Sequence, residues 1–244
     1  MSEAKPDYTP RQMIDRLVAF DTTSRKSNLD LIHFVQDYLA AFDIEATLIF
    51  NTEKTKANLF ATVGPDVPGG IVLSDHTDVV PVDGQDWKTN PFEVTRKERR
   101  LYGRGTADMK SFSAIALALV PHFLSLDLKR PLHFALSYDE EVGCLGCVDM
   151  VDLIAKSKAR PGLVIIGEPT SMRVINAHKG IRVLRTTVTG REAHSSRQHE
   201  GVSAIVIAGK LLHFISTLID ERKDRGDPTG RLEPPYKSLQ VDEI

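Results

Sequence analysis

The feature that most constrains the fold is a series of polar clusters, each placed where an apolar run meets a loop. The four clusters are Ser74–Asp78, Gly103–Lys110, Asp139–Glu141 and Gly167–Thr170. Apolar runs such as Ile71–Leu73 and Leu163–Ile166 are continuous, as expected of strands that are covered on both faces. Strand ends on one edge of an open α/β sheet converge in space, so distant clusters can form one site.

Helical and strand patterns alternate through the first two thirds of the chain. Apolar residues repeat at helical spacing from Pro10 to Val18 and over residues 29–42, 110–124 and 145–158. Strand patterns lie at residues 46–50, 58–63, 71–73, 132–138 and 163–166. This alternation predicts an α/β fold with a mixed, mostly parallel sheet and helices on both faces.

The pattern changes after Thr170, which indicates a second domain. Strand-like segments at residues 173–178, 181–190 and 236–241 accompany a long amphipathic helix at residues 201–220. We therefore predict a first domain over residues 1–171, which carries the four clusters. A smaller, partial α+β domain is predicted over residues 172–244.

Composition excludes several classes of function. The chain has 244 residues, 41% of them apolar and 26% charged, which is ordinary for a globular protein with a sizeable core. A formal net charge of -2 gives no electrostatic case for binding nucleic acid or an anionic membrane surface. No apolar run approaches the roughly 20 residues that span a bilayer. The first nine residues are polar and do not form a secretory signal, so a cytoplasmic protein is expected.

The two cysteines, Cys144 and Cys147, form a single C-x-x-C pair. Half of a zinc ribbon would need a second pair, which the sequence lacks. We interpret both as small, semi-apolar residues beside a helix start, with a redox pair as the alternative.

The clusters carry the residue types of a metal site. His76 and Asp78 lie two residues apart beyond a strand; a neutral imidazole suits zinc, and a nearby carboxylate can fix its tautomer. Asp108 follows a Gly-Arg-Gly turn that can hold a carboxylate rigidly. The alternatives are a polar turn with a surface histidine and an acidic helix cap.

Adjacent acids at Glu140 and Glu141 repel one another unless cations or protons intervene. One carboxylate can bind metal while its neighbour takes a proton from water. Glu168 supplies a further acid at another strand end, although acidic loops are the alternative for all three. His194 precedes two serines in a loop, where it can donate to an oxyanion. Jointly, the four clusters favour a metal site.

These motifs resemble the zinc-dependent deacylase and exopeptidase family, which includes acetylornithine deacetylase, succinyl-diaminopimelate desuccinylase, aminoacylase and glutamate carboxypeptidases. The resembling segments are Ser-x-His-Thr-Asp-Val-Val-Pro, Gly-Arg-Gly-Thr-x-Asp-Met-Lys, Glu-Glu and Gly-Glu-Pro-Thr, in this order. The resemblance covers nearly the whole chain, and Tyr138–Cys144 and Ala177–Gly180 are most similar to the acetylornithine deacetylases.

The resemblance implies hydrolysis of N-acetyl-L-ornithine to ornithine and acetate, a step of arginine biosynthesis. Succinyl-diaminopimelate or another N-acyl amino acid is the alternative small-molecule substrate. A third hypothesis is a catalytically inactive, truncated dimerisation or interaction module.

The resemblance also implies a metal-ligand set. His76, Asp108 and Glu168 would hold one zinc, and Asp108 would bridge to a second zinc held by Glu141. Cobalt is the alternative metal. The peptide bond from Asp108 to Met109 would be cis.

Three further residues have roles by resemblance. Asp78 would orient the imidazole, and Glu140 would act as base and proton shuttle. His194 would reach from the second domain, a lid and dimerisation domain, into the partner subunit's site of a homodimer.

Two positions depart from the family pattern. Asp75 stands where these relatives usually carry glycine, and it would either change the metal affinity or turn outward. No residue after Glu168 matches the late histidine that completes the second zinc site in the family. We therefore expect a truncated chain that binds one zinc more firmly than two, has little or no deacetylase activity, and leaves a sheet edge open.

Overall fold

A computed structural model describes residues 5–241. The chain divides into two compact units, Met1–Met172 and Arg173–Ile244. None of the helices in residues 5–241 combines the length and the apolar composition that crossing a bilayer requires.

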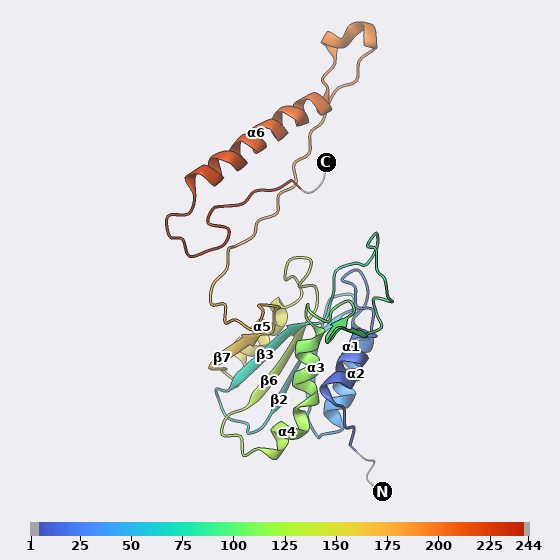
Figure 1. The fold of residues 1–244 in the computed structure, drawn as a ribbon, viewed down its shortest axis with the longest axis vertical. Helices are drawn as coiled ribbons and strands as arrows, with labels where there is room; N and C mark the ends of the chain where they lie inside the picture. The colour runs from blue at the N-terminus through green and yellow to red at the C-terminus, as the bar shows by residue number, and fades with distance from the viewer. Residues whose placement is uncertain (1–4, 242–244) are drawn as a thin grey trace. The chain divides into compact units, whose positions relative to one another are not determined.

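The first unit contains a five-stranded mixed sheet (Figure 1). In spatial order its strands are β1 (Ala46–Phe50), β2 (Ala57–Val63), β6 (Leu132–Ser137), β3 (Ile71–His76) and β7 (Leu163–Ile166). β1 pairs with β2 and β2 with β6 in antiparallel fashion, whereas β3 runs parallel to both β6 and β7. The prediction of a mixed α/β sheet is confirmed, and its parallel part consists of β6, β3 and β7. A separate hairpin joins β4 (Thr95–Lys97) to β5 (Arg100–Tyr102).

Helices cover both faces of this sheet. α1 (Pro10–Val18), α2 (Leu29–Ala40) and α3 (Lys110–Ala118) pack on one face, where the main core includes Leu59 and Phe134. α5 (Val148–Lys156) packs on the other, where Met150 contacts a smaller cluster that includes Phe60 and Val72. Successive residues of a strand point to opposite faces. Leu59 and Phe60 are consecutive in β2 and therefore belong to the two different hydrophobic clusters.

Local signals explain where the helices begin. Thr9 caps α1: its hydroxyl accepts from the Gln12 backbone N–H at 3.3 Å, and the side-chain Oε1 atom of Gln12 accepts from the Thr9 N–H at 2.9 Å. The helix predicted at residues 110–124 is interrupted, with α4 (Val120–Ser125) following α3 after Leu119. Pro121 has no N–H to donate to the Leu117 carbonyl, which instead accepts from the Tyr38 hydroxyl at 3.0 Å.

β7 differs from its prediction as a strand buried on both faces. All four of its residues are exposed, from 41% at Ile165 to 62% at Ile166. The reason is that β7 is the edge strand of the sheet and pairs only with β3 among the described strands. An apolar edge strand of this kind is a site where another strand can add.

The second unit consists of α6 (Ala204–Arg225), the short 3-10 helix η1 (Ser195–Glu200) and extended segments. The long helix is confirmed, with Ser203 as its cap. The strands predicted at residues 173–178, 181–190 and 236–241 are absent from the described part, where the unit's only β-bridge joins Arg191 to Val202. Strands need a partner for their backbone N–H and C=O groups, and no strand ladder pairs these segments in the described part of the chain.

Candidate metal centre

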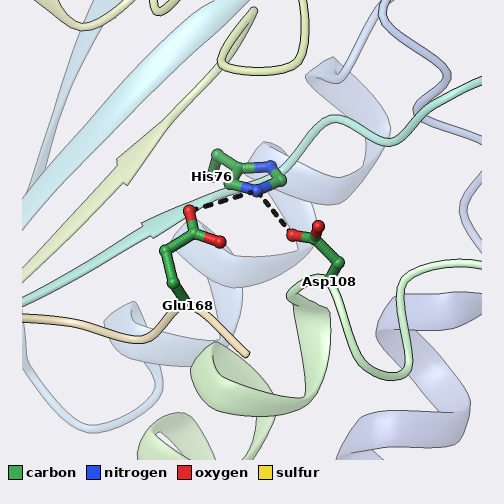
Figure 2. A group of neighbouring side chains, drawn as sticks. All are labelled: His76, Asp108 and Glu168. Carbon is green, nitrogen blue, oxygen red and sulfur yellow. Dashed lines mark hydrogen bonds and ion pairs between the residues drawn. The ribbon is translucent and has the colours of Figure 1, made fainter. Parts of the chain in front are cut away.

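Three parallel strands deliver the polar clusters to one edge of the sheet. His76 is the last residue of β3, Glu140 follows β6, and Glu168 follows β7. Asp108 comes from the loop that leads into α3, and its peptide bond to Met109 is cis, as the resemblance implied. Figure 2 shows the side chains of His76, Asp108 and Glu168 pointing toward one another from these separate elements.

The three side chains form a potential ligand set for one metal ion. The Nε2 atom of His76 lies 3.1 Å from Asp108 Oδ1 and 3.7 Å from Glu168 Oε1. One ligand atom from each residue lies within 4.8 Å of the other two. Zinc binds imidazole nitrogen and carboxylate oxygen, so the donor set fits this metal. The imidazole is buried, whereas both carboxylates are partly exposed.

The second ring nitrogen of His76 is held by Asp78, mainly through the backbone. The Nδ1 atom lies 2.9 Å from the Asp78 carbonyl oxygen and 3.6 Å from its carboxylate. The hydrogen bond from Nδ1–H to this carbonyl leaves Nε2 free to face the acids. The sequence predicted this orienting role for the side chain of Asp78, but the backbone carbonyl makes the shorter contact.

The Asp78 carboxylate instead organises the loop after β6. It accepts the Ser24 hydroxyl at 2.7 Å and the backbone N–H groups of Glu140 and Glu141 at 3.1 Å and 3.2 Å. Burial alone would raise the Asp78 pKa, but the interaction with the His76 imidazole, and then the hydrogen bonds from Ser24 and the Glu140 N–H, lower it. Asp78 therefore links the strand that carries the imidazole to the loop that carries the adjacent glutamates.

The metal-free cluster is rich in negative charge. Burial disfavours the imidazolium form of His76, but the hydrogen bond to Asp78 and the charges of Asp75 and Asp78 raise its pKa to about 10. Burial, and then the Asp108 charge, raise the pKa of Glu141. Burial also raises the pKa of Glu168, to which the charges of Asp108 and Glu140 add. A divalent cation at this position would relieve the repulsion among the carboxylates.

The remaining predicted residues lie at different places. Glu140 Oε2 is 3.8 Å from His76 Nε2, so Glu140 lies beside the three ligands. Glu141 is outside the three-residue group but close enough for its charge to interact with Asp108. His194 belongs to the second unit, where its Nδ1 atom lies 2.9 Å from the Ser196 hydroxyl.

Three contacts at the site were not predicted from the sequence. Ser24 donates to Asp78 across a long stretch of chain, and no local pattern indicates this contact. The Lys56 ammonium lies 2.5 Å from the Asp139 carboxylate and so neutralises the acid next to Glu140. The Cys144 thiol donates to Glu140 Oε1 at 3.4 Å, which the spacing within one short loop could have suggested.

The fold and the donor set together define an α/β protein with a candidate metal site at the carboxyl ends of parallel strands. The family model described as Peptidase family M20/M25/M40 matches residues 72–232, and the chain belongs to this family.

Curated relatives extend the comparison. An acetylornithine deacetylase of Proteus mirabilis is 38% identical over 219 residues, which cover 88% of this chain and 55% of the relative. An acetylornithine deacetylase of Shigella sonnei is 36% identical, with coverage of 90% and 56%. The chain thus spans little more than half the length of the curated relatives it matches.

Solved structures of low sequence identity support the fold. A tripeptidase from Staphylococcus aureus has a TM-score of 0.58 at 18% identity, covering 85% of this chain and 57% of that chain. An M20 family metallo-carboxypeptidase from Sulfolobus solfataricus has a TM-score of 0.57 at 21% identity, covering 66% and 37%.

Proposed function

We propose that the chain is the metal-binding part of a zinc-dependent amide hydrolase that removes the acetyl group from N-acetyl-L-ornithine, giving L-ornithine and acetate. The observation that carries the proposal is the convergence of His76, Asp108 and Glu168 within 4.8 Å. The substrate rests on the curated relatives named acetylornithine deacetylase, which match most of this chain.

His76, Asp108 and Glu168 would hold the zinc ion, and Glu141 would contribute to a second metal position next to Asp108. Zinc bound there would supply a Lewis acid for the acetyl carbonyl and would lower the pKa of a coordinated water. The described residues bring together one group of three ligand atoms, so one zinc should bind more tightly than a second.

Glu140 is proposed to move the proton. Its carboxylate lies beside the ligands, 3.8 Å from His76 Nε2, and remains partly exposed to solvent. The Asp78 carboxylate holds its backbone, and the Cys144 thiol donates to its Oε1 atom. From this position Glu140 can take a proton from water and deliver it to the nitrogen of the leaving amine.

The second unit is proposed to serve as a lid and dimerisation domain. Its described residues expose large apolar side chains, including Val174 at 96%, Ile181 at 90% and Ile205 at 84%. Exposed apolar surface on this scale supports an interface with a second copy of the chain. His194 would then act in the partner's site, and a solution mass of one chain would contradict the homodimer.

Metal analysis and activity assays test the proposed function. The chain dialysed against zinc should retain about one tightly bound ion, and His76→Ala should abolish this binding. His33→Ala, which removes an exposed histidine of α2, is the matched control and should retain the metal. Zinc binding that is insensitive to His76→Ala would refute the proposed site.

Turnover assays test the proposed substrate separately from the proposed metal site. Acetylornithine and succinyl-diaminopimelate should be assayed side by side, and we expect the low turnover of this chain to favour the acetyl substrate. Glu140→Gln should keep the zinc but remove measurable turnover, because the amide cannot accept the proton. Equal turnover of both substrates, or an active Glu140→Gln variant, would contradict the respective assignment.

A further inference from the structure

Asp75 is a buried carboxylate that the proposed chemistry does not use. It is the residue before His76 in β3, and it is only 2% exposed. Neither carboxylate oxygen has a hydrogen-bond partner among the described residues. Because a buried carboxylate without donors destabilises a fold, its burial at this position requires an explanation other than stability.

The strand geometry excludes a direct role as a metal ligand. Successive residues of a strand point to opposite faces, so Asp75 points away from the side on which His76 meets the acids. Leu73, on the same face as Asp75, packs against the core formed with the helices α1, α2 and α3. The alternative in which Asp75 turns outward to solvent is therefore wrong.

The carboxylate faces the first turn of α3. Burial raises the Asp75 pKa, whereas the hydroxyl and backbone N–H of Ser113 lie near enough to oppose this rise, as does the charge of Lys110, the first residue of that helix. Neither carboxylate oxygen makes a hydrogen bond of normal geometry within the described part of the chain. The N-cap residue Met109 makes no side-chain cap hydrogen bond, and the first turn contains no acidic residue. The N-terminus of a helix carries partial positive charge, so a negative charge on the neighbouring strand is favourable at this position.

The start of α3 is also fixed from a second direction. Lys110 is 1% exposed, and its Nζ atom donates to the Phe20 carbonyl at 2.6 Å. The backbone that enters this helix carries Asp108, two residues before the helix begins. The position of the first turn of α3 therefore determines where the Asp108 carboxylate lies.

We propose that Asp75 is a positioning residue of the metal centre: it anchors the first turn of α3 to β3 and so fixes Asp108 opposite His76. The inference rests on the proposed function, because it assumes that these two residues bind zinc. It explains why Asp75, a buried acid without hydrogen-bond partners in residues 5–241, stands in the core next to the candidate ligand His76.

Zinc affinity and backbone protection test this proposal in the 244-residue chain. Asp75→Ala should weaken zinc binding about tenfold or more in a competition assay with a chromophoric chelator, as loss of outer contacts does in other metal sites. Asp75→Asn, which keeps the shape but removes the charge, should weaken it less. The control is Val72→Ala, which opens a cavity on the opposite face of the same strand and should leave the affinity within about twofold.

Hydrogen exchange gives a readout that does not depend on metal. In the metal-free protein, Asp75→Ala should accelerate amide exchange in the first turn of α3, and Val72→Ala should not. Unchanged exchange in this turn, or unchanged zinc affinity in folded Asp75→Ala, would overturn the proposal. If the parent chain bound no zinc, the proposed function would fail, and the exchange experiment would still decide whether Asp75 anchors the helix.

Discussion

Replacing Asp75 with asparagine should stabilise the metal-free protein at neutral pH, by an amount that depends on pH. Burial raises the pKa of the Asp75 carboxyl from 3.8 to about 7. An acid with a raised pKa binds its proton more tightly in the folded state than in the unfolded state. The favourable contribution of that proton is complete below pH 3.8 and is lost as the pH rises to about 7.

The magnitude follows from the size of this shift. Each unit of pKa difference corresponds to about 1.4 kcal/mol, so a shift of about three units corresponds to about 4 kcal/mol at full ionisation. This is a large fraction of the roughly 5–15 kcal/mol by which domains are stable. Asparagine does not titrate, so the stability difference between Asp75→Asn and the parent should grow by about 2 kcal/mol from about pH 5 to about pH 7.

Urea unfolding in the presence of a chelator measures this difference. The single tryptophan, Trp87, lies in the first unit and reports its unfolding by fluorescence. Asp37→Asn, at an exposed acid of α2, is the control and should show no comparable trend. A stability difference between Asp75→Asn and the parent that stays constant with pH, or that shrinks as pH rises, would refute the reasoning.

Three further predictions concern the site and the first helix. The pKa of His76 is raised to about 10, so zinc must displace a proton from this imidazole when it binds. The zinc affinity should therefore rise with pH, by up to roughly tenfold per pH unit, and chelator competition measures this affinity. Ser24→Ala removes a hydrogen bond to the Asp78 carboxylate and should lower the free energy of unfolding by about 2 kcal/mol in urea. Thr9→Ala removes the capping box of α1 and should lower this free energy by about 1 kcal/mol, measured by thermal unfolding. An affinity that is independent of pH, or variants as stable as the parent, would contradict these expectations.

The sequence predicted the elements of the first unit well because their signals are local. Thr9 and Pro10 mark the start of α1, and apolar runs mark the central strands. The interruption after α3 also had a local signal, Pro121, which the apolar pattern of residues 110–124 concealed. At the site, the convergence of His76 with distant acids followed from the rule that parallel strands end at one edge.

What the sequence could not predict depends on partners in three dimensions. Alternating residues at 181–190 have the pattern of a strand, yet pairing requires a neighbour that no local pattern specifies. The exposure of β7 depends on its place at the sheet edge, which composition does not reveal. The same holds for the contact of Ser24 with Asp78 and for the inward orientation of Asp75.

The sheet order has a consequence for the assembly of the site. His76 and Glu168 become neighbours only when β3 and β7, which are separated by a long stretch of chain, have paired. Non-local pairing of this kind forms slowly, so a partly folded chain offers a metal ion isolated ligands rather than a complete set. Zinc binding should therefore follow helix formation during folding. The time course of zinc binding would then report when β3 and β7 pair.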